Sequence, residues 1–263
     1  GDLLAGQGGL AVRFRRDGAI FKVAETDDDG RAAVSFAPPA EGDYLFTAEV
    51  VPAGLPEAPP EPRTLRVACR APDAPLAVVD MDKTVVASGF QAVLIGDPEP
   101  MPGSAEVLER LAGTHTIVYL THRPDFFAPK SKAWLAAHGY PSGPVLLSSL
   151  GGFLKGSGAF KTEMLRALRG RFRRIEIGIG DKVSDALAYH ANGMRAFLIV
   201  QPDASADVAV LEAQVEELRK LPPQIEVVTD WAQIRRALFE GAGPASALPE
   251  LEKLLESRRA APE

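Results

Sequence analysis

The first 70 residues alternate between hydrophobic and polar positions, which is the pattern of half-buried β-strands. Segments with this alternation, and one further expected strand, lie at 10–14, 32–36, 44–50 and 64–69. Turns that contain glycine separate them, among them Asp17-Gly18 and Asp29-Gly30. Regular short strands with such turns predict a small all-β sandwich over residues 1–70.

After a proline-containing linker at 71–75, short apolar runs alternate with segments of helical periodicity. The predicted strands are 76–81, 116–121, 144–148, 174–180, 195–200 and 224–228. The predicted helices are 103–113, 128–138, 160–169, 183–192, 205–220, 230–240 and 246–259. This alternation is typical of a mostly parallel sheet with helices on both faces. The sequence therefore predicts an α/β domain over residues 76–263, preceded by the β unit.

Composition narrows the range of partners. The net charge of −6 gives no general attraction to nucleic acid, so no nucleic-acid partner is expected. No apolar run is long enough to cross a bilayer. The single cysteine, Cys69, excludes an intrachain disulfide and fits a reducing compartment, which favours a cytoplasmic location. Because the chain starts with Gly1 and not with methionine, the question of whether a targeting segment was removed stays open.

Carboxylates follow two of the predicted strands. Asp80 and Asp82 come at the end of one apolar run, where one could attack an electrophile while the other transfers protons. A metal-binding loop or a solvated turn would give the same short motif. Asp181 and Asp185 open a predicted helix, and their spacing of four places both on one helical face. Together with Asp80 they supply the hard oxygen ligands that suit Mg²⁺.

Other polar residues stand at neighbouring strand and helix ends. Thr121 ends a predicted strand, where its hydroxyl could donate to a phosphate oxygen, and Arg123 could reach an anionic group with its forked donors. Lys161 lies at a helix start, where a cation opposes the helix dipole unless it faces a carboxylate or phosphate. Lys155, in a glycine-rich stretch, is the rival for this position.

In this order, these residues resemble the haloacid dehalogenase superfamily of phosphotransferases over residues 76–240. Four segments of this chain are similar to the four motifs of that superfamily. They are, in order, Asp80-Met81-Asp82-Lys83-Thr84, Thr121, Lys161 and Gly180-Asp181 through Asp185. Lys83 stands where glycine is common and adds a cation beside the site. The resemblance implies a Rossmann-like core and a Mg²⁺-dependent phosphatase that forms an aspartyl phosphate. The residues from 26 to 36 also resemble hairpins of bacterial immunoglobulin-like and transthyretin-like domains.

The resemblance also implies a role for each residue. Asp80 is the expected nucleophile, and Asp82 the expected acid and base. Thr121 and Lys161 are expected to steady the transferring phosphoryl oxygens. The expected metal ligands are Asp80, Asp82 through its backbone carbonyl, Asp181 and Asp185. The expected substrate-binding residues are Lys83, Thr84, His122 and Arg123.

A finer resemblance, to the lipin-like phosphatidate phosphatases, lies in two stretches. They are Tyr119-Leu120-Thr121-His122-Arg123-Pro124 and the run from Trp134 to Leu147, which contains Gly139-Tyr140-Pro141-Ser142-Gly143-Pro144. The intervals 85–120 and 122–160 are too short for a large cap domain, so an open site is expected. A large or exposed phosphorylated substrate such as phosphatidate, a phospholipid, is therefore favoured. A non-catalytic binding or scaffold module and a nucleic-acid end phosphatase are the alternatives.

Overall fold

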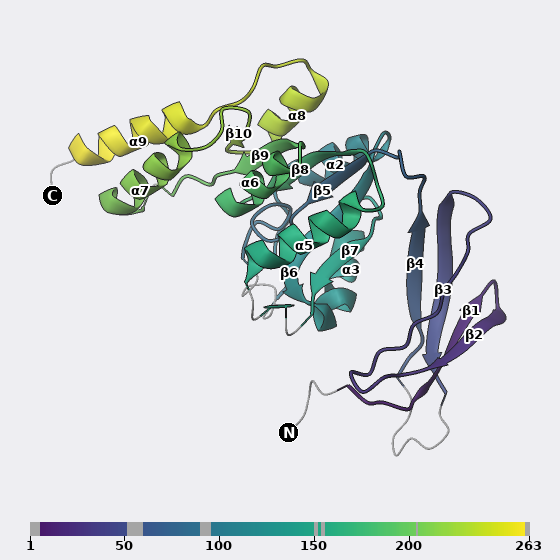
Figure 1. The fold of residues 1–263 in the computed structure, drawn as a ribbon. Helices are drawn as coiled ribbons and strands as arrows, with labels where there is room; N and C mark the ends of the chain where they lie inside the picture. Colours follow the sequence, from purple (N-terminus) through teal and green to yellow (C-terminus); the bar gives the residue numbers. More distant parts are fainter. Residues whose placement is uncertain are drawn as a thin grey trace. The chain divides into compact units, whose positions relative to one another are not determined.

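The computed structural model of the chain describes residues 6–51, 60–89, 96–149, 152–153, 156–203 and 205–260. The chain divides into two compact units, Gly1–Ala71 and Pro72–Glu263 (Figure 1). Within the described residues, no helix is both long and apolar enough to cross a membrane.

The first unit contains a four-stranded antiparallel sheet with the order β2-β1-β3-β4. Its strands are β1 (Ala11–Arg16), β2 (Ala19–Glu25), β3 (Gly42–Val50) and β4 (Arg63–Cys69). Asp17 and Gly18 join the first two strands, and both have a positive φ, 51° and 79°. Two such residues suit a tight hairpin because their backbone twist matches that of the paired strands.

The strand predicted at 32–36 is wrong. Residues 31–38 form no strand, and the described part of this unit holds one sheet rather than two facing sheets. Phe36 instead packs its ring edge-on against Phe21, Tyr44 and Phe46, with centroids 4.9–5.8 Å apart. The apolar alternation here thus reflects side chains that cover a sheet face, and not backbone pairing with a neighbouring strand.

The second unit contains a six-stranded parallel sheet with the order β10-β9-β8-β5-β6-β7. The strands are β5 (Leu76–Val79), β6 (Thr116–Pro124), β7 (Val145–Ser148), β8 (Ile175–Gly180), β9 (Arg195–Ile199) and β10 (Glu226–Val228). Strand order reverses between β5 and β8, so this unit is a doubly wound α/β fold, as predicted. Ligands bind such sheets beyond the carboxyl ends of the strands at the reversal.

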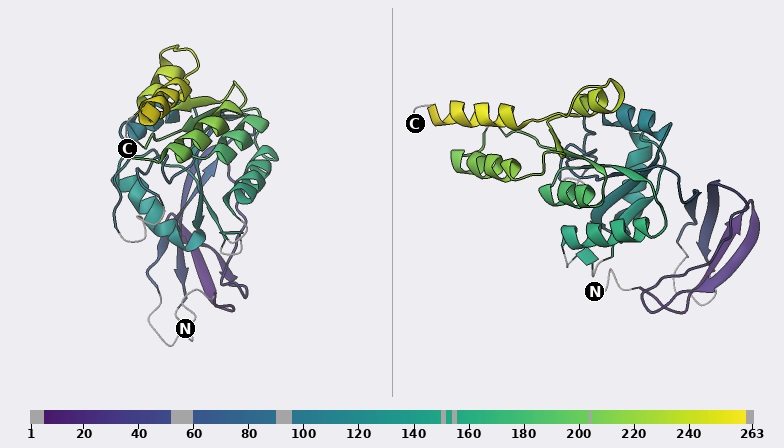
Figure 2. Two further views of the ribbon diagram at one scale, coloured as in Figure 1. Left: turned by 90° about the vertical axis from the view of Figure 1, so that its left-hand side faces the viewer. Right: turned by 45° about the horizontal axis from the view of Figure 1, so that its top comes forward.

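Helices cover both faces of this sheet (Figure 2). One face carries α2 (Ser104–Ala112), α3 (Ala128–Ala137) and α8 (Trp231–Phe239). The other carries α5 (Ser157–Arg169), α6 (Val183–Ala191), α7 (Val208–Arg219) and α9 (Leu248–Ala260). A short 3₁₀ turn, η1 (Asp125–Phe127), leads into α3. Each predicted helix and strand of this unit is confirmed, with ends that differ by a few residues at most.

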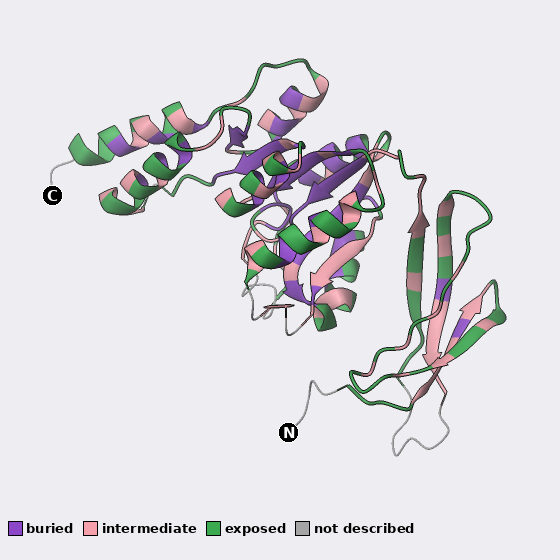
Figure 3. Ribbon diagram, viewed as in Figure 1, coloured by how far each residue is buried: buried purple, intermediate pink, exposed green. Residues whose placement is uncertain are grey.

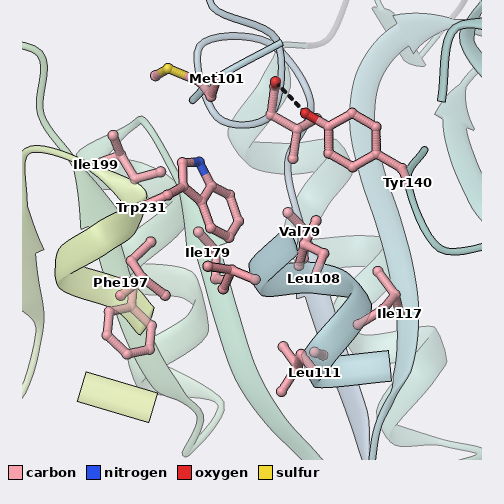
Figure 4. Packing of buried hydrophobic residues seen from close by; sticks show 14 of the residues in the cluster. Val79, Met101, Leu108, Leu111, Ile117, Tyr140, Ile179, Phe197, Ile199 and Trp231 are labelled. Carbon is pink, nitrogen blue, oxygen red and sulfur yellow. Dashed lines mark hydrogen bonds between the residues drawn. The ribbon is translucent and has the colours of Figure 1, made fainter. Parts of the chain in front are cut away.

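Two separate hydrophobic clusters hold the helices to the sheet. Successive residues of a strand point to opposite faces, so Val79 packs in the first cluster and Val78 in the second. Figure 4 shows the first cluster, where Trp231 and Leu108 meet Ile179 and neighbouring strand residues. Of the two central strands, β5 is buried throughout, and β8 is buried at every residue except Glu176 (Figure 3). Burial of both faces explains why these strands read as continuous apolar runs.

One glycine of β8 is required by this packing. A Cβ at Gly178 would lie 2.2 Å from Cγ of Tyr189, whose ring is fully buried under the sheet. We expect Gly178→Ala to lower the free energy of unfolding by about 3 kcal/mol, because a packed core cannot move to admit the methyl group. Urea unfolding measures this. Gly158→Ala in α5 is the control, since nothing lies within 4 Å of its Cβ position, and equal losses would contradict the argument.

Candidate active site

The loop after β5 carries Asp82 and Lys83 and is held tightly from both sides. Lys83 has a φ of +56°, and the Val86 amide donates to the Met81 carbonyl across the turn at 2.9 Å. Lys83 thus adopts the left-handed conformation that glycine enters at least cost, which is a physical reason for glycine to be common at this position.

Two buried side chains, Trp231 and Tyr140, donate hydrogen bonds that hold the same loop in place. The Trp231 indole nitrogen donates to the Thr84 carbonyl at 2.7 Å. The Tyr140 hydroxyl donates to the Val85 carbonyl at 2.8 Å (Figure 4). Ser104 Oγ lies 2.5 Å from the Tyr140 hydroxyl. Because these carbonyls are satisfied only in this geometry, the core itself sets where the loop carries its acidic side chains.

Three carboxylates and one lysine meet at the reversal of strand order. Asp80 follows β5, Asp181 follows β8, and Asp185 lies in the first turn of α6. Lys161 of α5 places its Nζ 2.9 Å from Asp80 Oδ2 and 2.5 Å from Asp185 Oδ2. The side chains of Lys161, Asp80 and Asp185 are at most 6% exposed. The backbone also joins the two strand ends, since the Asp80 amide donates to the Ile179 carbonyl at 2.9 Å.

The electrostatics of this cluster are strained by an excess of negative charge. Burial, and then the charges of Asp80 and Asp185, raise the pKa of Asp181 to about 7. Burial likewise raises the pKa of Asp185, against the opposing effect of Lys161. Burial alone would lower the pKa of Lys161, but the neighbouring carboxylates raise it above its usual value. The lysine is thus charged, and one cation faces three carboxylates.

A divalent cation fits this cluster. One oxygen from each of Asp80, Asp181 and Asp185 lies within 4.8 Å of the other two. Asp181 Oδ1 and Asp185 Oδ1 are buried and have no hydrogen-bond partner. Unpaired buried carboxylate oxygens are costly, and hard oxygen ligands of this kind suit Mg²⁺. The donor set therefore matches the predicted cofactor, with Asp82 outside the cluster of three side chains.

Asp82 is instead paired with Arg123. The Arg123 Nη2 donates to Asp82 Oδ1 at 2.7 Å, and Nε donates to Asp82 Oδ2 at 3.0 Å. The Nη1 of the same guanidinium donates to Ser131 Oγ of α3 at 3.0 Å. The Arg123 side chain is 1% exposed, whereas that of Asp82 is 21% exposed. Arg123, expected to bind substrate, thus contacts the expected acid.

These residues surround a cavity of about 210 Å³. Its lining comprises Asp80, Asp82, Lys83, Gly89, His122, Arg123, Phe153, Ser157, Lys161, Asp181 and Lys182. A second cavity of about 770 Å³ shares Lys83, Asp181 and Lys182 with it and extends along the end of β9 to α7. Both cavities therefore border Asp181, a member of the acidic cluster.

The remaining predicted residues differ in their placement. Thr84 and Thr121 are fully buried and do not line the smaller cavity. Thr121 Oγ1 lies 3.4 Å from the Arg123 amide nitrogen, which donates to it. His122 lines the cavity and stacks on Phe153, with ring centroids 4.9 Å apart, and burial lowers its pKa. Lys155 lies outside the described residues, so the structure does not test whether Lys155 could take the role expected of Lys161.

Sequence reasoning missed four residues of the cavity lining and one beneath it. Lys182 directly follows Asp181, and that adjacency was a usable signal. Ser157, Phe153 and Gly89 carry no motif that would single them out. Ser131 lies in the middle of α3, and only its contact with Arg123 shows its part.

The raised pKa of Asp181 predicts how stability changes with pH. Because the folded-state pKa, about 7, exceeds the usual 3.8, the stabilisation is fully present below about pH 4 and is lost as pH rises to about 7. In metal-free buffer we expect the free energy of unfolding to fall across that window, and Asp181→Asn to flatten the fall. Urea unfolding at a series of pH values measures it. An unchanged pH slope in the variant would contradict the assignment.

Comparisons with known proteins bear on the second unit. Residues 77–199 match the family model described as the LNS2 domain of PITM 1-3. No curated protein matches the chain. Among solved structures, a family 39 glycoside hydrolase from the gut symbiont Bacteroides cellulosilyticus WH2 matches at 11% identity with a TM-score of 0.21. That match covers 85% of this chain and 46% of the hydrolase chain, so this chain spans under half of it. A TM-score this low does not show a shared fold.

The family match includes every acidic and basic residue of the cluster, which are Asp80, Lys161, Asp181 and Asp185. The pair Asp82 and Arg123 also lies within it. The first unit lies outside the match, so its resemblance to immunoglobulin-like domains stays a prediction. Over residues 77–199 the chain is similar to an LNS2 domain, which belongs to the HAD-like, lipin-like phosphatase superfamily.

Proposed function

We propose that the second unit is a Mg²⁺-dependent phosphomonoesterase that works through an aspartyl phosphate on Asp80. The observation that carries the proposal is the meeting of Asp80, Lys161, Asp181 and Asp185 at the carboxyl edge of the sheet, beside a cavity that Asp82 also lines. A nucleophile, a proton carrier and a cation are thus grouped around one space of the right size for a phosphoryl group.

In the first step, an Asp80 carboxylate oxygen attacks phosphorus and the bond from phosphorus to the leaving oxygen breaks. Asp82, in its protonated form, gives its proton to that leaving oxygen, so the product departs as a neutral alcohol. Lys161 Nζ lies 2.9 Å from Asp80 Oδ2, so a cation stands beside the carboxylate that attacks. The same cation can stabilise negative charge on the phosphoryl oxygens as it develops.

In the second step, the Asp82 carboxylate takes a proton from water, and the oxygen of that water attacks phosphorus. The acyl-phosphate bond breaks, which regenerates the Asp80 carboxylate and releases inorganic phosphate. Asp82 ends this step protonated and ready for the next turnover. Two carboxylates with separate roles are required because one of them is esterified while the other moves the proton.

Asp80, Asp181 and Asp185 would hold the Mg²⁺ ion. When bound, the ion neutralises charge on the phosphoryl oxygens and screens the carboxylates from one another. Asp181 and Asp185 each bring a buried oxygen that has no other partner, so the protein supplies these ligands without breaking an existing hydrogen bond.

Phosphatidate is the first substrate that we propose to test. The similarity of residues 77–199 to an LNS2 domain supports a lipin-like phosphatase, and phosphatidate is the substrate that this resemblance favours. The described residues between Asp82 and Thr121 contain one helix, α2, which supports a site without a large cap. The cavity of about 770 Å³ beside the reactive residues gives room for a leaving group larger than phosphate itself.

Metal removal tests the proposal. We expect the full chain to hydrolyse p-nitrophenyl phosphate and phosphatidate in Mg²⁺, and to lose at least about a hundredfold of that turnover after EDTA treatment. Added Mg²⁺ should restore the activity. Ca²⁺ should restore much less, because it takes more oxygen ligands than Mg²⁺ and holds them at longer distances. Released phosphate is the measured quantity. Turnover that survives EDTA, or a protein that binds phosphate esters without hydrolysing them, would count against a phosphatase and favour a binding module.

A further inference from the structure

We propose that Arg123 is a positioning residue for Asp82 and does not bind the phosphoryl group. Its guanidinium, anchored to α3 through Ser131, holds the Asp82 carboxylate in the orientation from which it reaches the leaving oxygen. The inference rests on the proposed function, and it adds to it a role for one buried arginine and for one serine outside the four motifs.

The contacts of Arg123 carry this assignment. Nε and Nη2 donate to both oxygens of Asp82, at 3.0 Å and 2.7 Å, and Nη1 donates to Ser131 Oγ at 3.0 Å. Every nitrogen of the guanidinium therefore has a protein acceptor. Two parallel bonds to one carboxylate fix both its position and its plane, which a single bond does not.

Burial separates this role from substrate binding. The Arg123 side chain is 1% exposed although it borders the cavity of about 210 Å³. The partner carboxylate is 21% exposed, so the acid reaches into the cavity while the cation stays behind it. The lysines that line the same cavity, Lys83, Lys161 and Lys182, give a phosphate other cations nearer to solvent or to Asp80.

Ser131 explains how the guanidinium keeps its own orientation. It is fully buried in α3, a helix packed on the sheet through Trp134 and Leu135. The backbone between β6 and α3 is short, with only η1 (Asp125–Phe127) between them. The Arg123 guanidinium is thus held on two sides, by Ser131 of α3 and by Asp82 in the loop after β5. The orientation of Asp82 is set by α3 as well as by its own loop.

A comparison of two leaving groups tests the role in catalysis. The aryl leaving group of p-nitrophenyl phosphate departs without a proton, whereas that of glycerol 3-phosphate needs one from Asp82. For Arg123→Lys, which keeps the charge but loses the fork, we expect first-turnover release to fall by at least about thirtyfold for the alkyl ester. First-turnover release of p-nitrophenol should fall by less than about threefold. Ser131→Ala should shift both rates in the same directions, by smaller factors.

Two results would overturn the inference. Equal losses for both esters would show a role that does not act through Asp82. A raised KM and weaker inhibition by inorganic phosphate, with kcat unchanged, would show that Arg123 binds the phosphoryl group. Arg166→Lys, an exposed arginine of α5, is the matched control and should change neither rate.

A second measurement needs no turnover, so it separates failure of this inference from failure of the proposed function. Asp82→Asn leaves the buried Arg123 guanidinium without its counter-charge, and Arg123→Met leaves the partly exposed Asp82 carboxylate without its donors. The double variant leaves neither charge unpaired. We expect the folding equilibrium constants of the four proteins to show at least about fivefold coupling, with the double variant more stable than additivity predicts. Additive losses in urea unfolding would mean that the pair does not hold together in solution, and would overturn the inference. Inactive wild-type protein with strong coupling would instead contradict only the phosphatase.

Discussion

Asp80→Asn is expected to reduce phosphomonoester turnover by at least about a thousandfold, because the amide that replaces the carboxylate is a far weaker nucleophile. Asp80 is the residue whose oxygen would bond to phosphorus, and no neighbouring carboxylate is free to replace it. Asp181 and Asp185 would be occupied as metal ligands, and Asp82 is paired with Arg123. The loss should therefore fall on kcat, as measured by phosphate release under saturating substrate.

The same variant should remain folded. Lys161 keeps its 2.5 Å ion pair with Asp185 after the charge of Asp80 is removed, so no buried cation is left unpaired. One of three clustered negative charges is also gone, which relieves the repulsion that raises the pKa of Asp181. Asp73→Asn, at an exposed position, is the control. A variant that unfolds would contradict the expected stability, and one that retains more than about a tenth of the turnover would contradict the assignment of Asp80 as nucleophile.

Lys161→Met should lower the free energy of unfolding by about 3 kcal/mol in metal-free buffer near neutral pH. Lys161 is 1% exposed and is the cation that touches both Asp80 and Asp185. Its removal leaves buried carboxylates without a counter-charge, and that penalty exceeds what an isosteric apolar side chain can recover. Denaturant unfolding at fixed pH measures the effect.

Magnesium provides the discriminating condition for this second variant. If the carboxylates are the metal site, Mg²⁺ supplies the charge that the lysine supplied, and the destabilisation should shrink as the metal concentration rises. Lys253→Met is the matched control, since this lysine is exposed on α9. A loss of stability that is the same with and without Mg²⁺ would mean that the lysine and the metal do not share the cluster. Activity should fall in the variant at every metal concentration, because Lys161 also faces the nucleophile.

The α/β unit was predictable because its strands are buried on both faces and its helices on one. A strand such as 76–79 must then be apolar throughout, and a helix such as 208–219 must be apolar on one side, so both periods are visible in the sequence. The first unit obeys a weaker rule. Residues 32–36 alternate because Phe36 packs onto a face of the sheet. Alternation alone does not distinguish a segment that covers a sheet from a strand that pairs within one.

The chain itself determined the acidic edge of the sheet and its lysine. Asp80 and Asp181 follow strands that must be parallel, and parallel strands present their carboxyl ends on the same side, so these groups were bound to meet there. Tertiary structure alone decided that Arg123 faces Asp82, that Thr84 and Thr121 are turned into the core, and that Ser131 supports the arginine. Those choices depend on side-chain directions at points where residues 40 positions or more apart come into contact, or where a loop meets a helix. Spacing along a chain encodes the period of an element, but it does not encode which of several nearby partners a long side chain reaches.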